Sequence, residues 1–153
     1  MSTVEQSIEV NVPVRTAYNQ WTQFEDFPHF MGGVNKVLQK DDTTLEWEAE
    51  IAGQSRQWEA KIDEQIPDER IAWHATSGVK QAGVVTFHRI DDSVCKVMLQ
   101  MEFEGKDFAE KAADAIGIVK ARIKGDLQRF KEFSEKRGSE TGAWRGEVKQ
   151  TDK

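Results

Sequence analysis

The stretch from Tyr18 to Gly33 reads YNQWTQFEDFPHFMGG, and it holds more than a third of the 14 aromatic residues in the chain. Its apolar spacing is too irregular for a strand, and Pro28 prevents one long helix. Aromatic side chains gain a large free energy from burial, so this stretch must pack onto a large apolar surface. The rest of the chain has to supply that surface.

The composition limits the classes of protein to which the chain can belong. A length of 153 residues fits one domain, and 38% hydrophobic residues permit a core. The charged residues, 31% of the chain, favour a well-solvated surface over disorder. A net charge of -6 disfavours nucleic-acid binding and attachment to anionic membranes.

The localisation follows from what the sequence lacks. Cys95 is the only cysteine, so no internal disulfide can form, as suits a reducing compartment. Residues 1–10 lack the basic and apolar runs of a signal peptide, and no apolar run is long enough to cross a bilayer. We expect a cytoplasmic protein without stable membrane insertion. Its oligomeric state is not indicated.

Alternation of apolar and polar residues predicts a series of strands. The alternating segments are 4–12, 34–38, 44–51, 57–63, 71–75, 85–87 and 95–103. Short turns between them favour an antiparallel meander with one covered and one solvated face. Two short helices are expected between the first two strands, at 15–23 and 25–30.

The period changes after Gly105. Apolar residues then recur every three or four positions from Phe108 to Phe133, which predicts an amphipathic helix of about 30 residues. Asp107 is the expected N-cap, and Gly138 is expected to end the helix. Beyond the domain at 1–138 lies a polar tail at 139–153. Its residues Trp144 and Arg145 either dock, on the body or on a partner, or stay disordered.

These elements predict an α+β fold. A curved antiparallel sheet of about seven strands grips a long C-terminal α-helix, and two short helices lie between strands one and two. The space that such an arrangement leaves between sheet and helix is a typical ligand pocket. The stretch from Tyr18 to Met31 would form its wall or lid.

Local sequence supports this architecture through a resemblance. The segments 12–14, 17–18, 21–25, 27–31, 83–87 and 125–131 resemble the START-like, helix-grip superfamily, also called SRPBCC, over roughly 4–138. The similarity is to its polyketide cyclase/dehydrase branch, which includes coenzyme Q-binding proteins. The resemblance implies a pocket for polyketides, lipids, quinones, sterols or plant hormones. Some relatives catalyse ring closure and dehydration, but no catalytic residue carries over.

Candidate ligand-binding residues lie on the expected inner faces of the strands, on the helical stripe and in the aromatic stretch. Arg56 is included because it shares the parity of Trp58. The candidates are Tyr18, Trp21, Phe27, Phe30, Met31, Trp47, Arg56, Trp58, Trp73, Phe87, Met101, Ile116, Val119 and Ile123. We expect them to bind a hydrophobic or amphipathic small molecule without a cofactor.

Two alternatives remain open at this point. A cyclase or dehydratase would need polar groups in the pocket, and Arg56, Tyr18 and Thr22 are the best candidates. An interaction module would instead use exposed aromatic residues to grip a protein or a membrane.

No metal site is expected. His74 and His88 are predicted to lie nearly opposite each other on adjacent strands, but no third or fourth ligand accompanies them.

Overall fold

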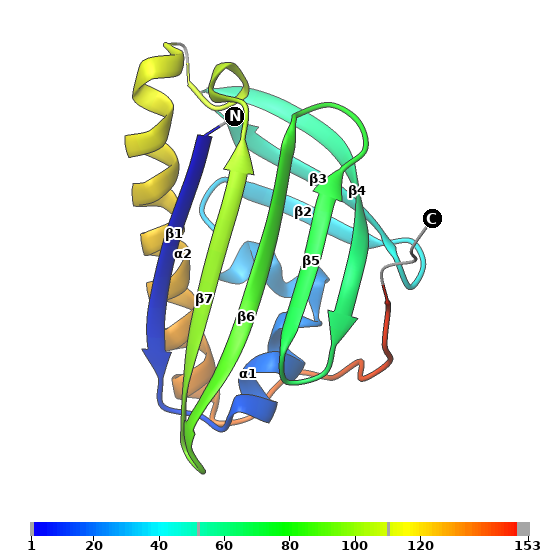
Figure 1. Cartoon of the computed structure of the whole chain (residues 1–153), viewed down its shortest axis with the longest axis vertical. Helices are drawn as coiled ribbons and strands as arrows, with labels where there is room; N and C mark the ends of the chain where they lie inside the picture. Colours follow the sequence, from blue (N-terminus) through cyan, green and yellow to red (C-terminus); the bar gives the residue numbers. More distant parts are fainter. Residues whose placement is uncertain (1, 52, 110, 150–153) are drawn as a thin grey trace.

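The computed structural model describes residues 2–51, 53–109 and 111–149. Seven antiparallel strands form one curled open sheet, and a long helix lies along one side of it (Figure 1). The strands are β1 Ser2–Val10, β2 Val34–Gln39, β3 Thr44–Ile51, β4 Gln54–Ile66, β5 Arg70–Ala75, β6 Gln81–Asp91 and β7 Val94–Phe103. The helices are α1 Val14–Trp21, the 3₁₀-helix η1 Phe24–His29 and α2 Ala115–Arg137. This is the predicted helix-grip arrangement.

The strand order explains how the sheet closes around its helix. From β2 to β7 each strand pairs with the next, as the short turns predicted, whereas β1 pairs with β7 at the far edge. A register shift between Ile62 and Glu64 interrupts the pairing of β4 with β5. Such bulges bend a strand, and the 13-residue β4 is curved in Figure 1.

Alternation along the strands divides the two faces of the sheet. On β3, Leu45 and Ala49 are buried, while Glu46 and Glu50 are exposed. The apolar residues at three- and four-residue steps on α2 cover the buried face: Val119, Ile123, Leu127 and Phe130. The core therefore lies between the sheet, α2 and the aromatic stretch.

The long helix begins later than predicted. It has 23 residues, about 35 Å, and two 3₁₀ turns at Gly105–Asp107 and Ala112–Asp114 precede it. Asp107 does not cap it, because its carboxylate accepts a hydrogen bond of 2.9 Å from the backbone N–H of Lys80. The end of the helix is as predicted: Gly138 adopts φ 73° and its N–H bonds to the carbonyl of Ser134.

The aromatic stretch packs onto a large apolar surface, as predicted from its many aromatic residues. Trp21 is its centre, with ring centroids 4.9 Å from Phe130, 5.7 Å from Phe27 and 6.2 Å from Phe87. Phe30 lies 5.2 Å from Phe130. Edge-to-face contacts of this kind add to the free energy of burial itself.

The C-terminal residues dock on the body as far as Lys149. Arg145 donates hydrogen bonds to Asn19 Oδ1 at 2.6 Å and to Asp68 Oδ2 at 2.8 Å, and its guanidinium lies 5.5 Å from the ring centroid of Tyr18. Val148 and Gln65 exchange two backbone hydrogen bonds. Of the arrangements considered for this segment, docking on the body is observed, and Arg145 is its main anchor.

The histidine prediction was wrong. The register places His74 opposite Ala82, and His88 opposite Lys96, so the two imidazoles do not face each other. His74 instead contacts the Asp63 carboxylate at 2.9 Å. In residues 2–51, 53–109 and 111–149, no three His, Cys, Asp or Glu side chains are grouped to hold a metal ion. Nor does any described helix have the length and apolarity to cross a membrane.

Candidate functional site

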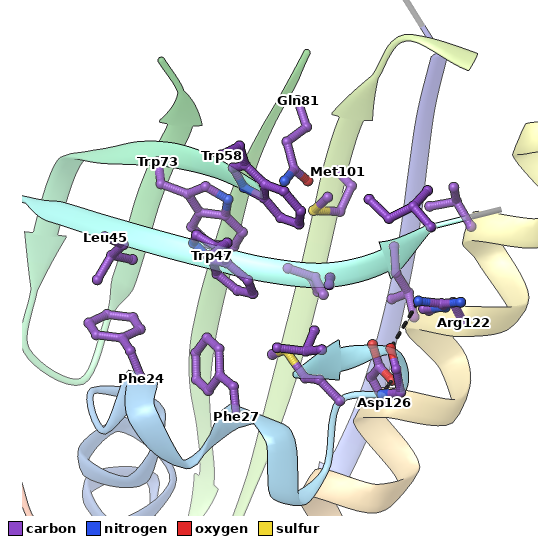
Figure 2. A pocket seen from close by; sticks show the side chains of 18 of the residues that line it. Phe24, Phe27, Leu45, Trp47, Trp58, Trp73, Gln81, Met101, Arg122 and Asp126 are labelled. Carbon is purple, nitrogen blue, oxygen red and sulfur yellow. Dashed lines mark hydrogen bonds between the residues drawn. The ribbon is translucent and has the colours of Figure 1, made fainter. Parts of the chain in front are cut away.

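A cavity of about 140 Å³ lies between the sheet and α2, with the aromatic stretch along one wall (Figure 2). Its lining is almost wholly apolar and comes from α1, η1, the turn after η1, six of the strands, the segment before α2 and α2 itself. Two lining residues, Ile118 and Arg122, are exposed to solvent, and they mark the side on which the cavity opens.

Tryptophan side chains form a flat wall of the cavity. Trp47 and Trp58 are register partners on β3 and β4, and their rings stack at 5.6 Å with an interplanar angle of 8°. Trp73 on β5 lies beside them in Figure 2. These three residues share the inner face, as their alternation predicted.

Gly83 makes room for this wall. It is the register partner of Trp73 on β6. A Cβ atom built on Gly83 would lie 2.6 Å from Cζ2 of the Trp73 ring and 3.1 Å from the sulfur of Met101. Glycine in a strand often marks such a close approach. The indole therefore lies against the backbone of β6 and not farther into the cavity.

Three polar side chains line the cavity: Gln81, Arg122 and Asp126. The Asp126 carboxylate accepts a hydrogen bond of 2.8 Å from the N–H of Gly32, and Arg122 Nη1 donates one of 2.9 Å to the Gly32 carbonyl. Arg129 Nε also donates to the carbonyl of Phe30 at 2.9 Å. Three residues on one face of α2 thus hold the turn that follows η1.

Burial raises the pKa of Asp126 above its ordinary value of 3.8. The N–H of Gly32 and the Arg129 guanidinium oppose this effect but do not outweigh it. A carboxyl group with a raised pKa therefore stands at the edge of an apolar cavity.

Most of the predicted ligand-binding residues lie in the lining. These are Trp21, Phe27, Met31, Trp47, Trp58, Trp73, Met101, Val119 and Ile123. That they contact a ligand remains a prediction.

Five predicted residues do not line the cavity. Tyr18, Phe30 and Phe87 are buried in the aromatic core beneath it. Ile116 points to solvent with 48% of its surface exposed, because the buried face of α2 carries Ala115 and Val119 instead. Arg56 lies near the start of β4, with its guanidinium 3.5 Å from Gln54 Oε1.

The sequence reasoning missed other lining residues. Those on the predicted inner faces share the alternation already used: Leu45, Ala49, Ile51, Ile62, Ile71 and Leu99. Phe24, Gly32, Val34, Phe108 and Ile118 come from the aromatic stretch, the strand after it and the segment before and within α2. For Arg122 and Asp126 the signal was their spacing of four residues on the long helix. Gln81 carried no such signal.

Other reactive groups lie outside the cavity lining. The thiol of Cys95 is buried, and desolvation raises its pKa to about 11, so it is a poor nucleophile. His29 stacks on Phe133, with ring centroids 5.9 Å apart. Neither residue lines the cavity.

Comparison with known proteins identifies the family. Residues 10–132 match the family described as polyketide cyclase / dehydrase and lipid transport. A protein of Streptomyces lincolnensis, described as an uncharacterized 17.2 kDa protein in the melC2-rnhH intergenic region, is 58% identical over 149 residues, covering 97% of this chain and 99% of that protein.

Solved structures share the fold. The Zhui aromatase/cyclase from Streptomyces sp. R1128 is 18% identical, with a TM-score of 0.72 over 94% of this chain and 99% of that one. A START superfamily protein from Mycobacterium smegmatis is 17% identical, with a TM-score of 0.69 over 86% and 97%. The fold, the cavity beneath the long helix and the match over most of the length agree: the chain belongs to the polyketide cyclase/dehydrase and lipid transport family.

Proposed function

We propose that this protein binds a hydrophobic or amphipathic small molecule, such as a lipid, a quinone or a polyketide-like compound, in the cavity beneath α2. The observation that carries the proposal is the apolar cavity walled by Trp47, Trp58 and Trp73. Unfilled space in a core forfeits dispersion contacts and destabilises the fold. A guest that fills it would restore those contacts.

The dimensions support a guest with one buried apolar end. A cavity of about 150 Å³ lined by apolar side chains binds benzene, and this one measures about 140 Å³. A longer molecule would extend past Ile118 and Arg122 into solvent. An amphipathic molecule suits that arrangement, because its polar end would remain hydrated.

Native mass spectrometry of freshly purified protein tests the proposal through the adducts it retains. Met101 lines the cavity from β7, while Met98 lies on the same strand at the opposite parity, outside the lining. We expect Met101→Trp to fill the cavity and remove the adducts, and Met98→Trp to retain them. Wild-type protein that carries no adduct and takes up no lipid, quinone or aromatic ketone would refute the proposal.

An enzyme of the cyclase or dehydratase type is the second candidate, and Asp126 favours it. The residues first considered do not serve, because Tyr18 and Arg56 lie outside the lining and Thr22 Oγ1 donates to the carbonyl of Asn19. A carboxyl group with a raised pKa could exchange a proton with an enolisable ketone. Deuterium exchange into 2-tetralone measures this, and exchange that is equally fast in Asp126→Asn would exclude that role.

The interaction-module alternative has less support. All 14 aromatic residues fall in the described part of the chain, and each is buried or half-buried. The exposed large apolar side chains there are aliphatic, and they are spread over β2, β6 and α2: Leu38, Ile90, Ile116 and Ile118.

A further inference from the structure

Three polar residues at the end of α1 are almost completely buried. They are Asn19, Gln20 and Thr22, and at most 2% of the surface of each is exposed. Burial of a polar side chain costs free energy unless the side chain is hydrogen-bonded. The segment that covers this end of the helix must therefore supply hydrogen-bonding groups.

The C-terminal segment supplies them. Residues 139–149, which we call the strap, pass α1 on the way from the end of α2 to β4 (Figure 1). Asn19 Nδ2 donates a hydrogen bond of 2.9 Å to Glu140 Oε1, and the N–H of Trp144 donates one of 3.1 Å to Thr22 Oγ1. The strap therefore pairs polar groups of α1 that its own docking buries.

The strap also holds the elements that form one wall of the cavity. The N–H of Thr141 donates a hydrogen bond of 2.9 Å to Gln20 Oε1 on α1, and its Oγ1 donates to the Asp26 carboxylate on η1. On their other side, α1 and η1 contribute three aromatic residues to the lining: Trp21, Phe24 and Phe27. One layer of structure thus lies between the strap and the cavity.

The contact between the strap and the body is mainly polar. Among the described residues of the strap, Val148 is the apolar side chain that packs against the core. A hydrogen bond within the protein replaces hydrogen bonds to water, so each one adds little net free energy. Release of the strap exposes little apolar surface, and segments of this kind open without unfolding of the core.

The docked strap also leaves buried polar groups unpaired. Arg145 contacts Tyr18 and Asp68. Val148 pairs with Gln65 through the backbone. The Tyr18 hydroxyl, the Gln65 amide and Asp68 Oδ1 are buried without a hydrogen-bond partner among the described residues. Such groups cost free energy, and release of the strap would give them access to water. This cost opposes docking and favours a strap that opens reversibly.

Resting on the proposed binding function, we propose that the strap is a reversible clamp on α1 and η1, and that its release lets a guest enter and leave the cavity. Elements that admit ligands are drawn from the parts of a fold that open at low cost. The strap is docked outside the cavity in both the free and the bound protein. Weakening it therefore raises the rates of binding and release together and leaves the dissociation constant unchanged.

Stopped-flow fluorescence measures both rates with 2-naphthol as the probe, through the emission of the tryptophans that line the cavity. We expect Arg145→Ala to raise the association and dissociation rate constants by a similar factor of about ten, the value of one hydrogen bond to a charged group. Lys149→Ala removes a charge from an exposed position of the strap and should leave both rates as in wild type.

A cross-link tests the opposite direction. Gln65 and Val148 are antiparallel partners that exchange two backbone hydrogen bonds. The Cα atoms of such a pair lie about 5.5 Å apart, within the range of a disulfide. In the double variant Gln65→Cys/Val148→Cys, we expect the oxidised protein to bind and release 2-naphthol more slowly than the same protein after reduction.

The outcomes distinguish the clamp from the binding function. If wild-type protein binds no 2-naphthol, binding of this probe in the cavity is refuted, and control of its entry by the strap with it. If 2-naphthol binds and its rates are the same in wild type, Arg145→Ala and both forms of the cross-linked variant, the clamp is refuted while binding stands. A changed dissociation constant with an unchanged association rate also refutes the clamp, because the strap would then only shape the wall.

Discussion

At the scale of single residues, Gly83 shows how one missing side chain shapes a binding surface. The Trp73 ring occupies the volume that a Cβ atom would need, so even alanine must displace the ring or the strand. Gly117, by contrast, lies on α2, where a Cβ atom would have nothing within 4 Å. The two glycines therefore have opposite consequences for stability.

We expect Gly83→Ala to destabilise the protein by about 1–3 kcal/mol, because it overpacks the wall of the cavity. It should also weaken 2-naphthol binding, since the displaced indole enters the guest's space. Urea denaturation and equilibrium dialysis measure the two effects. Gly117→Ala is the control and should stabilise the helix by about 0.5–1 kcal/mol. A stable Gly83→Ala variant with normal binding would show that Trp73 adapts without cost.

At the scale of elements, contacts distant in the sequence decide where regular structure begins and ends. The C-terminal segment has no periodic pattern, yet it docks because Arg145 reaches Asn19 on α1 and Asp68 in the turn between β4 and β5. Both partners are more than 70 residues away in the chain.

We expect Arg145→Ala to lower the free energy of unfolding by about 1–3 kcal/mol, since it leaves Asn19 and the half-buried Asp68 without their shared donor. Chemical denaturation measures the loss. Lys149→Ala removes a positive charge from the same segment, but its side chain is 78% exposed, so its effect should be small. Equal stability of the two variants would mean that the Arg145 contacts add nothing.

The difference between local sequence patterns and contacts distant in the sequence explains which predictions succeeded. Alternation is a local property, so it located the strands and placed Trp47, Trp58 and Trp73 on one face. The expected N-cap, Asp107, instead accepts a hydrogen bond from Lys80, 27 residues away in the chain, and no local pattern carries that information. The alternation along the strands also did not distinguish Phe87 from Met101, because both lie on the inner face. Phe87 packs on the aromatic stretch, whereas Met101 lines the cavity.

At the scale of the whole molecule, the stability should depend on pH through Asp126. Burial raises its pKa in the folded state, so folding favours the protonated form. The contribution of this protonated carboxyl group to the free energy of unfolding is fully present below the ordinary pKa of 3.8. It is lost as the pH rises through the folded-state pKa. At neutral pH the ionised carboxylate therefore opposes folding.

We expect Asp126→Asn to raise the melting temperature at pH 7, because Asn keeps an oxygen for the N–H of Gly32 and carries no charge. The difference from wild type should shrink as the pH falls through the raised pKa of the folded state toward 3.8. Thermal melts across this range measure it. Asp42→Asn, at an exposed position, is the control and should change little. Arg129 Nη2 lies 2.5 Å from Asp126 Oδ1. A lower melting temperature for Asp126→Asn at pH 7 would mean that this ion pair outweighs desolvation.

The pairing of the first strand with the last sets an order for synthesis of the chain. Ser2 is the register partner of Phe103, so β1 has no place in the sheet until β7 has been made. At about 5–20 residues per second, a ribosome takes roughly 5 to 20 s to synthesise the intervening segment. During that interval the nascent chain exposes β1 without its partner. Until β7 emerges, the unpaired edges of β1 are therefore available to a chaperone or to another chain.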